Sequence, residues 1–304
     1  MDEPRLLLFD TASVYFRAFF GIPTSLRTPD GRSINAVRGL LDYLARFITD
    51  YSPTQLACCW DNSWRPAWRV AKVASYKAHR VAHDDVEEVP PELSAQIPLI
   101  LDVLDALGLV VMGADGYEAD DVIGTLAATA GVPTEVVTGD RDLFQVVDDA
   151  RSVRVLYLGR GAGSHDRVDA AWLEQRYGVT PNQYVDFSVL RGDPSDGLPG
   201  VAGIGEKTAA GLLAAHRDLT GVLAAATAGL LSPRVTASLQ SSIDYLGAAR
   251  EVVAVATDVK LPAVDLSLPR SPADPARFDA LTASLGLGGS AQRILVALAQ
   301  ARNT

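Results

Sequence analysis

The chain has 304 residues, of which 48% are hydrophobic and 21% charged, so it can bury a sizeable core. This composition excludes collagen-like, disordered and disulfide-scaffold proteins. The 37 acidic and 27 basic residues give a net charge of −10, so a polyanionic partner has to meet a local basic patch or bound cations. The sequence shows no signal peptide, no apolar run of membrane-spanning length and no coiled-coil heptads, and we expect a cytoplasmic monomer that binds no membrane.

Short aliphatic runs predict buried strands in the first half of the chain. They cover residues 5–9, 55–60, 109–112 and 135–138, and helix-period stretches at 36–50 and 93–107 lie between them. Continuous apolar strands separated by helices are typical of a parallel sheet covered on both faces. We therefore predict an α/β fold with Rossmann-like layering up to about residue 175. The adjacent Cys58 and Cys59 are expected to be buried, reduced thiols.

A smaller helical domain is predicted from residue 176 to residue 304, where the period becomes helical and the connections become rich in Gly, Pro and Asp. Helices are expected at residues 181–191, 206–215 and 290–302. The proline-containing segment 261–275 is expected to be irregular.

Acidic residues follow the predicted strands in positions unusual for a solvated surface. Asp10, Asp61, Asp140 and Asp142 come at or just after strand ends, and the run Glu118-Ala119-Asp120-Asp121 begins a predicted helix. Because the carboxyl ends of parallel strands share one sheet edge, these acids should converge there and need compensating cations. Oxygen ligands favour Mg²⁺ or Mn²⁺, and so many acids favour two ions. Helix capping for the 118–121 run, and a turn with a cap for Asp140 and Asp142, remain alternatives.

A glycine-rich turn precedes the predicted helix at 206–215. Gly200, Gly203 and Gly205 permit a tight hairpin whose backbone approaches a phosphate, and Lys207 follows in the first helical turn. A plain helix-loop-helix turn is the alternative reading of this pattern.

A basic stretch interrupts the acidic chain between residues 69 and 80. It contains Arg69, Lys72, Lys77 and Arg80, with the aromatic Tyr76 beside the last pair. An aromatic ring next to two cations suits a base stacked beside a gripped phosphate. The alternative is an exposed helix whose cations pair with the acids that follow it, namely Asp84, Asp85, Glu87 and Glu88.

Taken together and in this order, six motifs resemble the 5′-nuclease family, which comprises bacterial 5′→3′ exonucleases, flap endonucleases and the N-terminal domain of bacterial DNA polymerase I. The resemblance covers about residues 5–260. The motifs are Phe9-Asp10 followed by Tyr15-Phe16-Arg17, Trp60-Asp61, Tyr76-Lys77-Ala78-His79-Arg80, Gly116 to Asp121, Thr138 to Leu143, and Gly192 to Ala209.

The resemblance implies a PIN-like domain at residues 1–175, with a helical arch at about 70–95 above the active site. It also implies a helix-three-turn-helix module at about 181–216, within the helical DNA-binding domain at 176–304. One metal group would comprise Asp10, Asp61, Glu118, Asp120 and Asp121, and the other Asp140, Asp142, Asp193 and Asp196, with Asp120 as a bridge.

Roles for further residues follow from the same resemblance. Lys77 and Arg80 would contact the scissile phosphate and act with Asp120 in catalysis, while Tyr76 would stack on a terminal base. The residues expected to bind DNA are Arg17, Arg69, Lys72, Tyr76, Gly200, Gly203, Gly205, Lys207 and Thr208. Two or more Mg²⁺ or Mn²⁺ ions are the expected cofactors, with a monovalent cation at the Gly200–Gly205 hairpin as a further candidate.

The implied activity is two-metal-ion hydrolysis of DNA at 5′ ends, 5′ flaps, nicks and gaps, in replication and repair. Two alternatives stand beside it. A non-catalytic protein that binds DNA structures would use the glycine hairpin alone, and a PIN-type ribonuclease would not need that hairpin.

Overall fold

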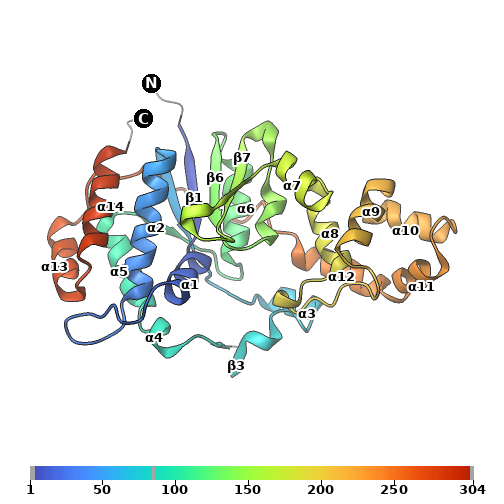
Figure 1. Cartoon of the computed structure of the whole chain (residues 1–304), viewed down its shortest axis with the longest axis horizontal. Helices are drawn as coiled ribbons and strands as arrows, with labels where there is room; N and C mark the ends of the chain where they lie inside the picture. Colours follow the sequence, from blue (N-terminus) through green and yellow to red (C-terminus); the bar gives the residue numbers. More distant parts are fainter. Residues whose placement is uncertain (1–3, 84–85, 302–304) are drawn as a thin grey trace.

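The computed structural model describes residues 4–83 and 86–301, and its centre is a six-stranded sheet (Figure 1). The strand order is β5-β2-β1-β6-β7-β8; the first five strands run parallel and β8 pairs antiparallel with β7. The bounds are β1 (Leu6–Asp10), β2 (Gln55–Cys59), β5 (Val110–Met112), β6 (Thr134–Thr138), β7 (Val153–Tyr157) and β8 (Asp166–Val168). The α/β prediction and its four strands are confirmed, and β7 and β8 are additional to it.

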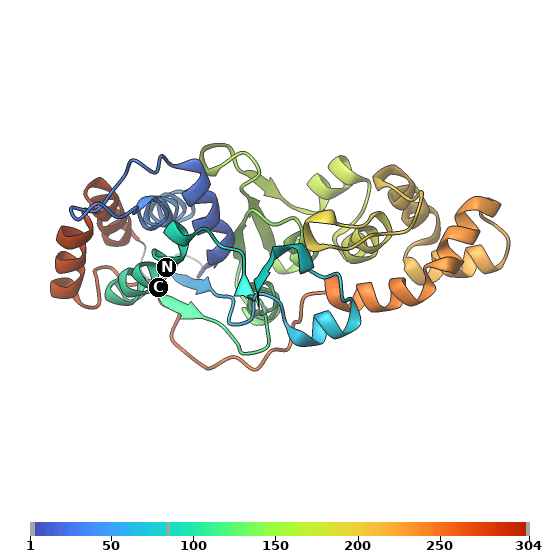
Figure 2. The same cartoon turned by 90° about the horizontal axis from the view of Figure 1, so that it is seen from below.

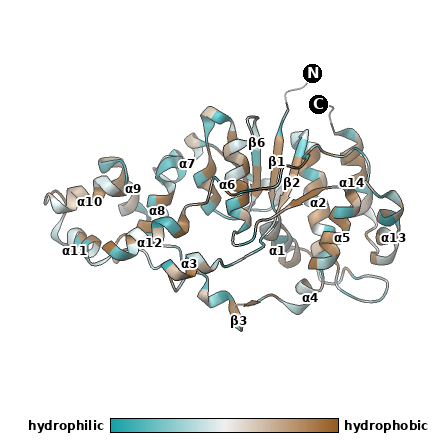
Figure 3. Cartoon of the chain, turned by 180° about the vertical axis from the view of Figure 1, so that it is seen from behind, coloured by the Kyte–Doolittle hydropathy of each residue, from teal (hydrophilic) through white to brown (hydrophobic). Residues whose placement is uncertain are grey.

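Alternate residues of β1 enter two different cores. Leu6 and Leu8 pack on one face of the sheet, and Leu7 and Phe9 pack on the other. All four side chains are buried, as the continuous apolar run predicts for a sheet covered on both sides. The brown colour of the central strands in Figure 3 follows this pattern.

Helices cover both faces of the sheet. The first core packs against α6 (Ala119–Thr129), α7 (Ala170–Tyr177) and α8 (Tyr184–Arg191). The second core packs against α1 (Thr11–Gly21), α2 (Asn35–Tyr51), α5 (Ile97–Leu107), α13 (Pro275–Leu285) and α14 (Gly289–Gln300). The single helix expected at 93–107 is divided into α4 (Pro91–Ser94) and α5, because Pro98 has no N–H to donate and fits the first turn of a new helix.

The helical domain extends away from one end of the sheet (Figure 2). It contains α8, α9 (Glu206–His216), α10 (Leu219–Thr227), α11 (Pro233–Ser241) and α12 (Ile243–Val253). The predicted helix at 181–191 begins as the 3-10 turn η5 (Pro181–Gln183) and continues as α8.

The last helices do not belong to this helical domain, in contrast to the expected 176–304 boundary. Phe278 and Leu285 of α13, with Ile294 and Leu298 of α14, are buried in the second core beside α2 and α5. Figure 1 shows α13 and α14 at the opposite end of the molecule from α9, α10 and α11. Their apolar side chains therefore complete the sheet domain.

The irregular segment that was expected at 261–275 carries the chain back to the sheet domain. It pairs with the start of β2, where the N–H of Leu56 donates to the carbonyl of Leu266 at 2.9 Å and the N–H of Leu268 donates to that of Thr54 at 2.9 Å. The expected closing helix at 290–302 is α14, and Arg302 lies outside the described residues.

The segment at 67–94 is less helical than the expected arch. It consists of α3 (Ala67–Lys72), the 3-10 turn η1 (Ala78–Arg80), the two-stranded pair β3 (Val81–His83) and β4 (Val86–Glu87), and α4. Asp84 and Asp85, two of the acids considered as surface partners, lie outside the described residues. Among residues 4–83 and 86–301, no helix is long and apolar enough to cross a membrane.

Candidate active site

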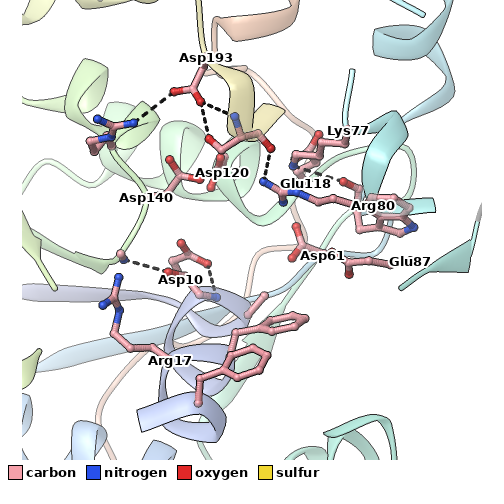
Figure 4. Close-up of a pocket in the computed structure, with 18 of the residues that line it drawn as sticks. Asp10, Arg17, Asp61, Lys77, Arg80, Glu87, Glu118, Asp120, Asp140 and Asp193 are labelled. Carbon is pink, nitrogen blue, oxygen red and sulfur yellow. Dashed lines mark hydrogen bonds and ion pairs between the residues drawn. The ribbon is translucent and has the colours of Figure 1, made fainter. Parts of the chain in front are cut away.

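A cleft of about 720 Å³ lies at the carboxyl edge of the sheet, beneath the 67–94 segment (Figure 4). Six of the nine acids expected to bind metal line it: Asp10, Asp61, Glu118, Asp120, Asp140 and Asp193. They come from the ends of β1, β2 and β6, from the start of α6, and from the loop after α8. The prediction that strand ends bring acids together is therefore confirmed for Asp10, Asp61 and Asp140, which meet Glu118 and Asp120 from the start of α6, while Asp193 was expected here only from the family resemblance.

Asp10 is fixed at the centre of this edge by two hydrogen bonds. Its Oδ1 accepts from the N–H of Ser13 at 3.1 Å, which caps α1, and its Oδ2 accepts from the hydroxyl of Thr138 at 2.6 Å. Burial raises the pKa of Asp10 to about 7, and the nearby Asp61 and Asp140 add to this direction. A cation in the cleft would favour the ionised form of this carboxylate.

The side chain of Asp120 faces the same cleft as Asp10 and Asp140 (Figure 4). Burial, followed by repulsion from Asp140 and Asp10, raises the pKa of Asp120 well above its ordinary value. Asp61 lies opposite, and its Oδ1 accepts from the N–H of Ala119 at 2.7 Å. Burial also raises the pKa of Asp61. Mutual repulsion among these acids is the electrostatic condition that divalent cations relieve.

Three of the nine expected acids do not line the cleft: Asp121, Asp142 and Asp196. Asp142 lies just behind it, and its Oδ1 is buried without a hydrogen-bond partner. Burial, followed by repulsion from Asp140 and Asp196, raises the pKa of Asp142 well above its ordinary value. Burial raises the pKa of Asp196 to about 6.

These residues fit hard divalent cations. The side chains that gather here supply oxygen donors, and the unpartnered Oδ1 of Asp142 is an acceptor that has still to be satisfied. Across residues 4–83 and 86–301, no three acidic, histidine or cysteine side chains are already arranged around one point as metal ligands. The acids thus line an open cleft and do not form a closed cage.

Two cations from the overlying 67–94 segment, Lys77 and Arg80, pair with two of the nine expected acids, and their predicted contact with a phosphate stays a prediction. The ammonium of Lys77 pairs with Oε2 of Glu118, and Nη2 of Arg80 donates to Oδ1 of Asp196 at 2.9 Å. Burial alone would lower the pKa of Lys77, but the facing Glu118 reverses this and the pKa rises, so the side chain stays charged. Lys77 also has a positive φ of 47°, uncommon for a residue with a Cβ.

Arg17 lines the cleft from α1, as expected for a residue near phosphate. The Nε of Arg17 is buried and has no hydrogen-bond partner. The guanidinium lies so close to Gly139 that a Cβ there would be 2.5 Å from Nη2. The absence of a side chain at Gly139 therefore leaves room for this cation.

The basic stretch does not form the continuous surface that its sequence suggests. Arg69 is buried against Glu118 and Asp121, and Lys72 pairs with Glu251 on α12. Tyr76 is 4% exposed, and its hydroxyl donates to Oε1 of Glu118 at 2.8 Å. In this structure neither the Arg69 guanidinium nor the Tyr76 ring is open to DNA.

Asp121 is also placed differently from the expectation. It has no exposed surface, and its Oδ2 accepts from the N–H of Glu118 at 3.1 Å. This is the helix-capping alternative that the sequence left open, and it places Asp121 behind the cleft. Part of the capping alternative holds for Asp140 too, because its Oδ1 accepts from the N–H of Asp142 at 2.8 Å.

The glycine hairpin before α9 is exposed except at its anchors. Val201 and Ile204 are buried, while Gly203, Gly205, Lys207 and Thr208 are exposed around the start of α9. Gly203 has a positive φ of 79°, as the turn requires. This leaves exposed backbone and one ammonium group at a helix N-terminus, the arrangement predicted for a phosphate contact.

Gly200 differs from the other hairpin glycines. Its N–H donates to the hydroxyl of Tyr245 at 3.0 Å, so that donor is already used inside the protein. A Cβ at Gly200 would lie 2.5 Å from the backbone nitrogen of Gly192. Gly200 thus serves backbone packing and not the phosphate contact expected of it.

Several cleft residues were missed by the sequence analysis: Phe16, Phe20, Trp64, Glu87 and Arg141. Phe16 and Phe20 are one turn apart on α1, with ring planes 21° apart and centroids at 6.5 Å, and Phe20 is 71% exposed. Their i, i+4 spacing beside Arg17 was a visible signal, but the buried Val14, Tyr15 and Phe19 on the same helix obscured it.

Comparison with known protein families covers most of the chain. Residues 5–178 match the family model described as "5'-3' exonuclease, N-terminal resolvase-like domain", and residues 179–276 match "5'-3' exonuclease, C-terminal SAM fold".

Curated relatives are similar over nearly the full length. A 5'-3' exonuclease from Streptomyces coelicolor is 54% identical over 299 residues, which cover 96% of this chain and 99% of the relative. A 5'-3' exonuclease from Mycobacterium tuberculosis is 48% identical over 312 residues, which cover 96% and 97%. DNA polymerase I from M. tuberculosis is 39% identical over 265 residues, which cover 85% of this chain and 28% of the polymerase.

Solved structures share the fold at low identity. A bacteriophage T5 flap endonuclease in a pseudo-enzyme-product complex with DNA and metal ions has a TM-score of 0.65 at 17% identity, covering 97% of this chain and 100% of the other. The catalytic core of Rad2 with a DNA substrate has a TM-score of 0.61 at 15% identity, covering 98% and 93%. These matches confirm the architecture of sheet domain and helical domain.

Proposed function

The chain belongs to the 5′-3′ exonuclease family, and from this premise we propose that it hydrolyses DNA at 5′ ends and 5′ flaps with two or more bound divalent cations. The observation that carries the proposal is the cleft itself. Acids from the ends of β1, β2 and β6 and from the start of α6 line one side of the cleft, whose volume is about 720 Å³. Cations from α1 and from the overlying 67–94 segment line the same cleft. A metal-dependent phosphodiester hydrolase needs both sets of charges at one place.

Bound Mg²⁺ or Mn²⁺ would supply a water of lowered pKa and would stabilise charge on the leaving oxygen. The residues that would hold these ions from the cleft wall are Asp10, Asp61, Glu118, Asp120, Asp140 and Asp193, and Asp142 and Asp196, which lie outside the lining, are further candidates. Lys77 and Arg80 then neutralise the non-bridging phosphate oxygens from above, and Arg17 holds an adjacent phosphate from α1. The fixed hydrogen bonds of Asp10 keep its carboxylate in one orientation.

Two further surfaces support a DNA substrate with an unpaired 5′ end. The exposed amides and Lys207 at the start of α9 suit the backbone of the duplex part, with a monovalent cation as a candidate at this hairpin. The exposed ring of Phe20, with the partly buried ring of Phe16 beside it, suits an unpaired base, a role that the buried Tyr76 does not fill in this structure.

The test is single-turnover cleavage of an end-labelled 5′-flap duplex in Mg²⁺, Mn²⁺ or EDTA, beside a blunt duplex and the same sequence as RNA. We expect products near the flap junction and at the 5′ end, only with metal and only with DNA. Tight binding without any metal-dependent product would favour a DNA-structure-binding protein. Faster cleavage of RNA would favour a PIN-type ribonuclease.

The cellular role that fits this activity is the removal of primers and flaps during replication and repair by a cytoplasmic monomer. Sedimentation of the purified protein, alone and with a flap duplex, tests the oligomeric part of this proposal. A dimer under both conditions would contradict it.

A further inference from the structure

Asp121 has no hydrogen-bonding capacity left for a cation. Its Oδ1 accepts from Nη2 of Arg69 at 2.7 Å and from the N–H of Ala256 at 2.8 Å. Its Oδ2 accepts from Nη1 of Arg69 at 2.8 Å and from the N–H of Glu118 at 3.1 Å. A metal ion would have to break bonds that a fully buried, bidentate ion pair supplies.

Arg69 joins three parts of the molecule through a single side chain. It lies on α3 at the base of the overlying segment, and Nη1 reaches Oε1 of Glu118 at 3.0 Å in addition to Asp121. Its Nε donates to the carbonyl of Val252, at the end of α12, at 3.0 Å. The guanidinium is 2% exposed, so DNA does not reach it in this structure.

The end of α12 is held in a second place close to the acids. Nε2 of Gln145, which follows Asp142 in the 3-10 turn η2 (Asp142–Val146), donates to the carbonyl of Val253 at 3.0 Å, and its Oε1 accepts from the N–H of Val255 at 2.9 Å. The end of α12 is thus bonded to Arg69 and to Gln145, and the N–H of Ala256 just beyond it donates to Asp121 of α6. The helical domain and the acid edge are connected by directed hydrogen bonds and not by apolar packing alone.

We propose that Arg69 is a positioning residue for the cleft acids and that Asp121 is its anchor, not a ligand of the cations. By holding Asp121 and Glu118, Arg69 fixes the first turn of α6, from which Asp120 points into the cleft. By holding Val252, it sets this turn against the helical domain. The inference rests on the proposed function for the role of the acids, but its central measurement does not need cleavage.

The central test is Mg²⁺ affinity without DNA, measured by isothermal titration calorimetry. Partners that orient metal-binding carboxylates are typically worth about 10- to 100-fold in metal affinity or activity. We expect Arg69→Met and Asp121→Asn each to lower Mg²⁺ affinity by a similar factor on this scale. The double variant should bind Mg²⁺ no more weakly than the weaker of the two single variants, because both substitutions remove the same Arg69–Asp121 interaction.

If Asp121 is instead a ligand of the cations, the expected change in the Mg²⁺ affinity of Arg69→Met has the opposite sign. If Asp121 were a cation ligand restrained by Arg69, Arg69→Met would free its carboxylate and leave Mg²⁺ affinity unchanged or higher. Asp121→Asn would then lose affinity as Asp120→Asn does. Both assignments predict a loss in Asp121→Asn, so the Arg69→Met variant decides between them, and an unchanged or higher Mg²⁺ affinity in Arg69→Met would overturn the proposal.

Arg69→Lys separates charge from geometry. An ammonium keeps the positive charge but cannot form the two parallel bonds to Asp121. We therefore expect kcat of Arg69→Lys to lie between that of Arg69→Met and that of the wild type, and KM to remain near the wild-type value. Full restoration by lysine would mean that charge alone matters and would refute the positioning role. If Arg69→Met does not fold, Arg69→Lys and Asp121→Asn carry the same test.

Binding of a flap duplex in EDTA distinguishes positioning from DNA contact. A buried Arg69 predicts an unchanged affinity and an unchanged slope of log affinity against log salt in Arg69→Met. A reduced slope would place Arg69 on the DNA and overturn the proposal. The matched control is Arg277→Met, which removes an arginine that pairs with two aspartates on α5, away from the cleft. It should leave Mg²⁺ affinity and kcat unchanged.

Failure of this inference and failure of the proposed function give different results. Failure of the wild-type protein to cleave any DNA would remove the proposed activity while leaving the calorimetric comparison intact. Normal cleavage and Mg²⁺ affinity in Arg69→Met, with only thermal stability lost, would leave the activity standing and refute the positioning role.

Discussion

The ammonium of Lys77 lies against Oε2 of Glu118, so the cation expected to meet the scissile phosphate is paired with an acid expected to meet a metal. The other oxygen of Glu118 accepts from Tyr76 and Arg69. In this arrangement a side chain of the overlying segment neutralises one of the cleft acids. Divalent cations and a phosphate would replace this internal pair by two intermolecular ones.

Replacing Lys77 by alanine should slow the chemical step more than it weakens DNA binding. The side chain is proposed to neutralise charge that grows in the transition state, and removing one such partner typically costs about 10²–10³-fold in rate. Single-turnover rates and affinities for one flap duplex provide the comparison. Lys260→Ala, which removes an exposed lysine of the segment after α12 that has no proposed role in binding or catalysis, is the control and should retain the wild-type rate. Equal losses of rate and affinity would reduce Lys77 to a phosphate anchor.

Asp120→Asn and Asp140→Asn should each lower the single-turnover rate by roughly 10²–10³-fold or more while DNA binding is largely kept. Both side chains face the cleft, and neither amide replacement can supply the lost negative charge. Asp279→Asn, on the exposed surface of α13, is the matched control and should cleave normally. A near-normal rate in either cleft variant would remove that residue from the proposed metal site.

The stability of the metal-free protein should fall as pH rises from about 4 to about 7. Burial raises the pKa of Asp10 from 3.8 to about 7, so in this window the folded protein binds a proton that the unfolded chain has released. The stabilising effect of that proton is complete below pH 3.8 and is lost as pH passes 7. Thermal melting in EDTA across this range measures it.

Two additions to the same melting series test its cause. Asp10→Asn, which carries no charge at any pH, should flatten the curve, and Mg²⁺ should raise the melting temperature more at pH 8 than at pH 5. An identical slope in Asp10→Asn would assign the pH dependence to other groups.

Gly200→Ala and Gly205→Ala should have different consequences despite their shared motif. At Gly200 a Cβ meets the backbone of Gly192 at 2.5 Å under a positive φ of 69°, and strain of this kind costs about 1–3 kcal/mol. At Gly205 nothing lies within 4 Å of the new Cβ, so the free energy of unfolding should change by less than about 1 kcal/mol. Urea unfolding measures the first effect. Duplex affinity is the readout for Gly205→Ala. It should fall if the Gly205 amide contacts a phosphate, because the added Cβ hinders the close approach of the phosphate to the backbone.

Most acids of the cleft were predictable because their placement is local, whereas Asp193 was expected only from the resemblance to the 5′-nuclease family. Asp10 directly follows an aliphatic run, and a parallel strand carries its last residue to the shared edge whatever its distant partners are. The hairpin before α9 was predictable for the same reason. Gly203 and Gly205 favour a tight turn, and Lys207 follows them in the first turn of a predicted helix.

The burial of Arg69 and Tyr76 was not predictable from their neighbourhood. Their sequence context predicts surface residues of a basic stretch, but their partner Glu118 is more than 40 residues away and Val252 is 183 residues from Arg69. Gly200 is similar, because its amide is taken by Tyr245, 45 residues later. The return of α13 and α14 to the sheet domain likewise depends on complementary apolar surfaces that no local pattern encodes.

The path of the chain between α12 and α13 has a mechanical consequence. The helices from α8 to α12 leave the sheet domain after α7 and rejoin it through the segment that pairs with Thr54 and Leu56. They are therefore tethered at both ends, as an inserted module, and cannot swing as a body on a single linker would. The surface proposed to bind duplex DNA therefore keeps the same orientation relative to the cleft. The helical domain then has little orientational freedom to lose when a substrate binds.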